Sequence, residues 1–203
     1  MSSALSAPHG LSNLNGTHIR LGVFLEFVNA VANVGVGVVL FPILRQHRER
    51  MAIGYLATRI IESLLLLVSS LAVLMLVPVG QDLLRADAAT ASELATVATL
   101  AVQGYHLAFQ SAEIALSVGA LTLCYVLYEA RLVPRPLAVL GFAGYVALFA
   151  SGWLYIAGHH TVAPFLYVPG GLFELILPLW LIVKGFRDPA PAGNAHDSDE
   201  LEH

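Results

Sequence analysis

The sequence contains very little cysteine and very little charge. Cys124 is its only cysteine among 203 residues, so an intrachain disulfide is excluded and cysteine usage indicates no compartment. Charged residues make up 12% of the chain, whereas soluble domains have about 25%. No basic patch is interleaved with aromatic residues, and no zinc-type Cys/His spacing occurs. A nucleic-acid-binding protein is therefore not indicated.

Common catalytic and targeting motifs are also missing. The chain has no G-x-S-x-G nucleophile motif, no glycine-rich phosphate loop, no H-E-x-x-H and no C-x-x-C. Residues 1–16 are small and polar, without the basic segment and the apolar core of a secretory signal peptide. These absences exclude the enzyme classes that such motifs identify, and they leave the cofactor unknown.

Apolar residues dominate the composition, at 57% of the chain. A soluble core of this size could not bury so much apolar surface, whereas the bilayer interior is itself apolar. A transmembrane helix needs about 20 mostly apolar residues. Five stretches meet this requirement, from about Ile19 to Phe41, Ala52 to Val77, Val97 to Tyr128, Leu137 to Ala157 and Phe165 to Val183. The sequence predicts an all-α, polytopic transmembrane bundle of about five spans.

The basic residues predict how the bundle is oriented. Lys and Arg accumulate on the cytoplasmic side of membrane proteins. Seven of them follow the first, third and fifth stretches: Arg45, Arg48, Arg50, Arg131, Arg135, Lys184 and Arg187. The opposite side has only Arg20 and Arg85. We therefore expect the N-terminus outside and the C-terminus inside, and an external loop from about Pro78 to Glu93.

Both ends of the chain are expected to lie outside the bundle. We expect residues 1–17 to form a polar tail and residues 18–187 to form the bundle. Residues 188–203 are expected to be a disordered tail, because they are rich in Pro, Ala, Gly and Asp. That tail ends in Leu201-Glu202-His203, which looks like the remnant of a purification tag.

The third stretch leaves several alternatives open. Its apolar periodicity runs from about Glu93 to Tyr128, which is longer than a bilayer requires. One long helix could project outward, or a separate interfacial segment could end near Gly104. A hairpin with two crossings is a third alternative, and it would place the loop with Arg131 and Arg135 outside.

Polar residues recur at helical spacing inside these apolar stretches, so each set shares one helix face. The sets are Glu26, Asn29 and Asn33; Arg59 and Glu62; Gln103, His106, Gln110, Glu113 and Ser117; Ser151, Tyr155 and His159; and Glu174. Ionisable groups within a membrane are costly and tend to face the bundle interior. We therefore expect the five polar faces to meet in an intramembrane cavity.

The charges of this cavity suggest a function. Four carboxyls against one arginine cannot all stay ionised in a low-dielectric site, so some are protonated or a bound cation balances them. We expect the site to bind a small molecule, a lipid or a cation through Glu26, Asn29, Arg59, Glu62, His106, Gln110, Glu113 and Glu174.

Other hypotheses fit the same residues. Arg59 and Glu62 could form a buried pair that fixes helix register, in a structural or partner subunit whose amides serve as interhelical hydrogen-bond groups. A membrane enzyme could use Glu113 or Glu174 as acid or base on a lipophilic substrate. A haem or metal protein could use His106, and a metal could bind His159 and His160 with His106 or Asp87. Besides membrane lipids, a second copy of the chain is a partner compatible with the sequence.

Several motifs follow one another over residues 20–187. They are Phe41-Pro42-Ile43-Leu44-Arg45, Gly54-Tyr55 with Arg59 and Glu62, Leu127-Tyr128 with Arg131-Leu132-Val133-Pro134-Arg135, and Glu174-Leu175 with Trp180 to Phe186. In this order they resemble a bacterial membrane family known as domain of unknown function number 4386. The resemblance implies a small helical bundle of the bacterial inner membrane without an established activity. It also marks Glu26, Arg59, Glu62 and Glu174 as positions of the family pattern.

Overall fold

The computed structural model describes residues 16–159 and 163–186, which are helical and contain no strand. The helices are α3 (Gly16–His47), α4 (Glu49–Leu83), α5 (Ala88–Glu129), α6 (Arg135–Ile156), the 3-10 helix η1 (Ala163–Leu166) and α7 (Tyr167–Lys184). The five α-helices of this described part are each long and apolar enough to cross a membrane. The predicted all-α bundle with five spans is thereby confirmed, and the chain is an integral membrane protein.

The ends of the helices differ from those expected. The bounds expected for the external loop, Pro78 to Glu93, are wrong, because α4 continues to Leu83 and α5 begins at Ala88. The third stretch is one continuous helix of 42 residues, so the interfacial segment and the hairpin are both wrong. Apolar composition locates the part of a helix that fits the bilayer, whereas hydrogen bonding carries the helix onward until a capping residue stops it.

Local signals explain both ends of α5. Asp87 is its N-cap, and its Oδ1 accepts a hydrogen bond of 2.9 Å from the backbone N–H of Thr90. At the other end Arg131 has a φ of 54°, and the N–H of Leu132 bonds to the carbonyl of Leu127 at 3.2 Å. This pattern is a Schellman motif, in which a left-handed residue ends the helix.

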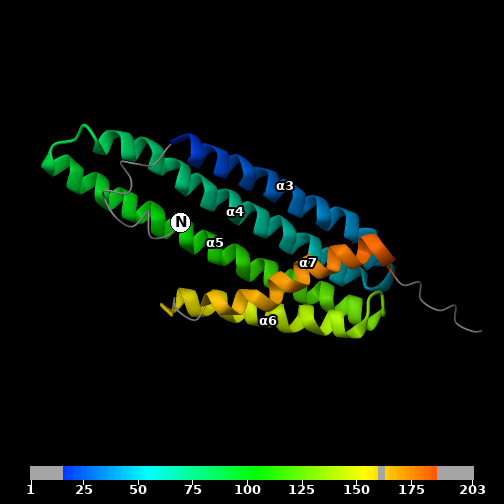
Figure 1. The fold of residues 1–203 in the computed structure, drawn as a ribbon. Helices are drawn as coiled ribbons and strands as arrows, with labels where there is room; N and C mark the ends of the chain where they lie inside the picture. Colours follow the sequence, from blue (N-terminus) through cyan, green and yellow to red (C-terminus); the bar gives the residue numbers. More distant parts are fainter. Residues whose placement is uncertain (1–15, 160–162, 187–203) are drawn as a thin grey trace, which may run out of the picture.

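The helices pack in the order of the chain, α3 against α4, α4 against α5, α5 against α6 and α6 against α7. Figure 1 shows that the α4–α5 hairpin extends beyond the ends of α6 and α7. The 42 residues of α5 span roughly 63 Å, and the 22 residues of α6 span roughly 33 Å, at about 1.5 Å per residue. The shorter helices match the hydrocarbon thickness of roughly 30 Å, whereas α5 is about twice as long as a bilayer requires.

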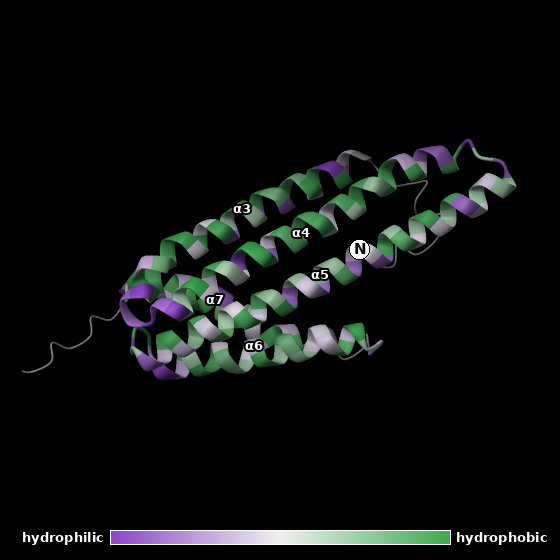
Figure 2. Cartoon of the chain, turned by 180° about the vertical axis from the view of Figure 1, so that it is seen from behind, coloured by the Kyte–Doolittle hydropathy of each residue, from purple (hydrophilic) through white to green (hydrophobic). Residues whose placement is uncertain are grey.

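The main core lies toward the end of the bundle that carries most of the arginines. Its buried side chains come from all five α-helices and the α5–α6 turn, and they include Leu44, Tyr55, Leu127, Val133 and Phe173. Many large apolar side chains point outward instead, such as Val31, Leu64 and Ile182. Figure 2 shows hydrophobic residues along the lengths of the helices and hydrophilic residues at the two ends of the bundle. This distribution is that of a protein whose sides face lipid.

One close backbone contact positions α7 on α6. A Cβ added to Gly144 would lie 2.6 Å from the backbone nitrogen of Gly170, which is closer than real Cβ contacts. The missing side chain therefore lets the two helices approach closely, as small residues commonly do in membrane bundles. The next residue, Tyr145, is thereby brought to the face of α7.

Both tails and some expected features lie outside the described residues. They include most of the polar tail 1–17, the tail 188–203, His160 and Arg187. The predicted orientation, with the N-terminus outside, stays a prediction.

Candidate functional site

A pocket of about 820 Å³ lies among α3, α4, α5 and α7, with one residue contributed by α6. Its polar lining consists of Glu26, Asn29, Asn33, Tyr55, Arg59, Glu62, Glu113, Tyr145 and Glu174. Tyr145 and Glu174 stand near the middle of α6 and α7, the two helices whose lengths match the bilayer. The pocket therefore lies about halfway along these two spans.

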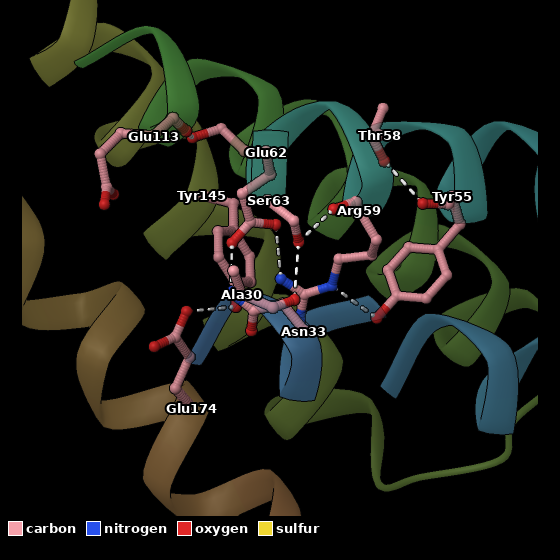
Figure 3. A network of polar contacts seen from close by, with 11 residues as sticks. Ala30, Asn33, Tyr55, Thr58, Arg59, Glu62, Ser63, Glu113, Tyr145 and Glu174 are labelled. Carbon is pink, nitrogen blue, oxygen red and sulfur yellow. Dashed lines mark hydrogen bonds and ion pairs between the residues drawn. The ribbon is translucent and has the colours of Figure 1, made fainter. Parts of the chain in front are cut away.

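Arg59 is held by hydrogen bonds from two directions. Its guanidinium NH1 donates to Glu62 Oε2 at 2.8 Å, and its Nε donates to the Tyr55 hydroxyl at 3.2 Å. Asn33 of α3 donates from Nδ2 to Glu62 Oε1 at 3.1 Å. Figure 3 shows this network, in which both oxygens of Glu62 are used. The pair Arg59–Glu62 is thus satisfied within the protein and connects α4 with α3.

Ser63, next to Glu62, fixes the same helix contact. Its hydroxyl is within 3.0 Å of the Ala30 carbonyl on α3 and 2.8 Å of the Arg59 carbonyl on its own helix. A hydroxyl has one proton to donate, so the two carbonyls share it. This contact holds α3 beside α4 at the level of the pocket.

Glu174 is positioned by α6. The Tyr145 hydroxyl donates a hydrogen bond of 3.0 Å to Glu174 Oε1, and the Tyr145 ring packs edge-on against Phe173 at 5.7 Å. In Figure 3 the side chain of Glu174 extends from α7 toward Tyr145, whereas that of Glu113 points from α5 away from the Arg59–Glu62 pair. With Glu26 of α3 and Glu62 of α4, they bring carboxyls from four helices to the lining of one pocket.

The lining is rich in acid and poor in base. Among the described residues, four glutamates line the pocket, and Arg59 is the one Arg or Lys that does so. Arg59 is paired with Glu62. The other three carboxyls, of Glu26, Glu113 and Glu174, have no second Arg or Lys in the described part of the lining to balance them. The structure therefore brings together the acidic residues that the sequence pattern marked, together with Asn29 and Arg59.

His106 and Gln110 do not line this pocket, although both share the Glu113 face of α5. Gln110 is 4% exposed, and its Oε1 accepts a hydrogen bond of 3.2 Å from the Tyr167 hydroxyl. The His106 ring lies 5.9 Å from the Tyr155 ring. These two residues occupy the next turns of α5, toward the end where α6 finishes.

A metal site of three or more His, Cys, Asp or Glu side chains is not formed by residues 16–159 and 163–186. The four pocket carboxyls therefore line a common space without gathering around one point. His159 is exposed after the end of α6, and the expected metal site of the histidine pair involves His160, outside the described residues.

The sequence pattern missed Tyr145 as a member of the site. It stands at the middle of α6, whereas membrane tyrosines are enriched near span ends. A hydroxyl at mid-span needs a hydrogen-bond partner when it is buried. The position of Tyr145 at mid-span therefore indicated that its hydroxyl has a polar partner. That this partner is Glu174 of α7 could be identified only from the packing.

Family membership agrees with the resemblance of the motifs. A family model described as a domain of unknown function, DUF4386, matches residues 3–185. The chain belongs to this family. No curated protein and no solved structure matches the chain. For this DUF4386 protein, function has to be inferred from the chemistry of the pocket.

Proposed function

We propose that the protein binds an amphipathic organic cation, an amine with an apolar body, in this pocket. The observation that carries this proposal is the excess of carboxyls over basic groups in the lining. We propose the inner membrane of a bacterium as the location, which the family resemblance suggested.

Electrostatics favours a cationic ligand. Carboxylates are costly to bury unless a positive charge accompanies them. Arg59 already serves Glu62 at 2.8 Å, so it cannot equally balance Glu113 and Glu174. A ligand cation placed between α5 and α7 would stabilise these carboxylates, and proton release from the carboxyls would accompany its binding.

The rest of the lining favours an apolar body on that cation. Apolar side chains of four helices complete the pocket, and they include Val39, Leu66, Phe109, Leu116 and Leu177. Phe109 also brings an aromatic ring to the lining, and aromatic rings attract cations. A volume of about 820 Å³ lies within the usual range of small-molecule sites, roughly 300–1,000 Å³.

The arrangement of α3 and α7 supports entry from the lipid. Both helices line the pocket, but they do not form a packed helix pair with each other. Val39 of α3 and Pro178 of α7 line the pocket and are also exposed. An amphipathic cation that dissolves in the bilayer could therefore reach the carboxyls between these two helices.

The absence of a three-donor cluster in the described segments favours an organic cation over a metal ion. Metal ions need several ligands at short distances around one point. An ammonium group with an apolar body instead uses separated carboxyls and the walls between them.

The test is a binding titration of the purified protein with tetraphenylphosphonium, a permanently charged lipophilic cation, together with native mass spectrometry for a co-purified amine. We expect saturable binding with one site per chain. Glu113→Gln and Glu174→Gln should each weaken it by about 2 kcal/mol, roughly thirtyfold in Kd. Glu93→Gln is the matched control, since Glu93 is exposed on the same helix and does not line the pocket.

Three results would overturn the proposal. The first is binding that is absent or non-saturable in a folded parent protein, and the second is equal binding by the Glu113→Gln, Glu174→Gln and Glu93→Gln proteins. Preferential binding of an anionic amphiphile such as dodecyl sulfate would likewise contradict it.

A further inference from the structure

The side-chain amide of Gln110 is buried next to the pocket, on the side where α6 finishes, and one of its polar atoms has no hydrogen-bond partner. Gln110 is 4% exposed, and its Nε2 has no hydrogen-bond partner, while its Oε1 accepts from Tyr167. Turning the amide over would exchange the two atoms and leave the oxygen unpartnered instead. Either way one polar atom of Gln110 is buried without a protein partner.

A buried polar atom without a protein partner is a binding position for a small polar molecule such as water. A buried polar group without a hydrogen bond destabilises the fold, and ordered water is the usual partner of buried polar groups that the protein leaves unsatisfied. Gln110 lies where three helices meet, because Tyr167 belongs to α7 and the Gln110 carbonyl would lie 3.6 Å from a Cβ on Gly152 of α6.

Gln110 also lies between the pocket and one end of the bundle. Glu113 follows it by three residues on the same face of α5 and lines the pocket. In the other direction His106 precedes it by four residues, and the His106 ring lies 5.9 Å from the ring of Tyr155 in the last turn of α6. The exposed His159 follows that turn. Polar groups therefore continue from the pocket to the end where α6 finishes.

We infer that Gln110 binds a water molecule, and that this water connects Glu113 to bulk solvent at the end of the bundle where α6 finishes and α7 begins. Protons then reach Glu113 by exchange along hydrogen bonds, in which O–H and N–H bonds are the only ones that break and form. The buried apolar core, which includes Leu44, Leu127 and Val133, occupies the arginine-rich end of the bundle. The pocket would therefore exchange protons with the side where α6 finishes and not with the arginine-rich side.

Charged and titratable groups around Glu113 set the pH at which its carboxyl titrates, whereas Gln110 sets the side of the membrane from which the proton comes. The titratable and charged groups that line the pocket with it are Glu26 of α3, Tyr55, Arg59 and Glu62 of α4, Tyr145 of α6 and Glu174 of α7, and those that stand toward Gln110 are His106 of α5, Tyr155 of α6 and Tyr167 of α7.

The test measures proton access without any pocket ligand, so its result is independent of the proposed binding function. The full chain is reconstituted in vesicles in one orientation, checked by thiol labelling of a Gln81→Cys reporter at the α4–α5 end. Dicyclohexylcarbodiimide, which enters the bilayer and reacts with protonated carboxyls, then labels Glu113, and mass spectrometry quantifies the adduct on its peptide. The pH is changed on one side of the vesicle at a time.

We expect the Glu113 adduct to fall about tenfold per pH unit above its midpoint, as for a single titrating group, when the pH is changed on the Gln81 side. A change on the arginine-rich side should leave the adduct unchanged. Gln110→Leu should abolish the response to the Gln81 side, whereas Gln110→Asn, which keeps an amide, should retain it. Gln110→Met provides the same test as Gln110→Leu if the leucine protein does not fold.

The inference fails if labelling of Glu113 in the parent protein follows the pH of the arginine-rich side or of both sides equally. It also fails if the folded apolar variant of Gln110 responds like the parent.

Discussion

Arg59 and Glu62 form an ion pair of 2.8 Å between NH1 and Oε2, one turn apart on α4, with side chains only 15% and 5% exposed. Asn33 donates to the other oxygen of Glu62, and Tyr55 accepts from the Nε of Arg59. The pair therefore has hydrogen-bond partners on both members. It adds no net charge to the pocket, and the acidic character of the lining comes from Glu26, Glu113 and Glu174.

Removing one member of the Arg59–Glu62 pair should be strongly destabilising. Glu62→Gln leaves the guanidinium without its counter-ion, and Arg59→Gln leaves the carboxylate alone. Each change should lower the free energy of unfolding by about 3–5 kcal/mol. Denaturant unfolding of the purified protein in lipid nanodiscs would measure both variants. The variant with both changes should lose less than the sum of the two single losses, and simple additivity would contradict the role of the pair.

The contact between Gly144 and Gly170 should be sensitive to a single methyl group. Gly144→Ala puts a Cβ 2.6 Å from the Gly170 nitrogen, so α7 must shift, at a cost of about 1–3 kcal/mol. Gly104→Ala is the matched control, because a Cβ there meets nothing within 4 Å. That variant should be stabilised by about 0.5–1 kcal/mol, since alanine is favoured over glycine in a helix. Thermal melting of the two proteins compares them, and equal melting temperatures would argue against the close packing of α6 and α7.

The stabilisation of α5 by its N-cap residue, Asp87, should be lost at acid pH. Hydrogen bonds from the Thr90 side chain and backbone hold the pKa of Asp87 below its ordinary value of 3.8. Because the folded-state pKa is the lower one, the cap contributes fully above pH 3.8, and its contribution is lost as the pH falls through the folded-state pKa. The Thr90 amide resonance should report this titration by NMR. Asp87→Asn retains an acceptor oxygen and should remove the titration, whereas an unchanged profile in that variant would show that another group is responsible.

The orientation predicted from the basic residues can be tested with two neutral, exposed positions at opposite ends of the bundle. Cys124 is 1% exposed, so it should not react with a membrane-impermeant maleimide in the folded protein. We expect Gln46→Cys to react only from the cytoplasmic side and Gln81→Cys only from the outside. Neither substitution changes the charge balance that sets the orientation. The reverse labelling pattern would show that the N-terminus lies inside.

The sequence by itself determined the number of spans and the polar faces of the helices. Both follow from local regularities, since apolar length selects membrane helices and spacings of three and four residues place Glu26 with Asn33, or Arg59 with Glu62, on one face. The length of α5 was harder to predict from the sequence, because the end of a helix depends on capping residues such as Asp87 and not on hydropathy.

Only the tertiary structure decided which of these polar groups meet. Glu62 could be recognised from spacing as a partner of Arg59, but the contribution of Asn33 required the packing of α3 on α4. Tyr145 reaches Glu174 because two glycines allow α6 and α7 to touch. Gln110 and Glu113 share a face of α5, yet one meets Tyr167 above the pocket and the other lines it. The spacing of residues along a helix specifies the face on which a side chain lies. Its partner depends on which residue of the neighbouring helix packs at the same level along the bundle.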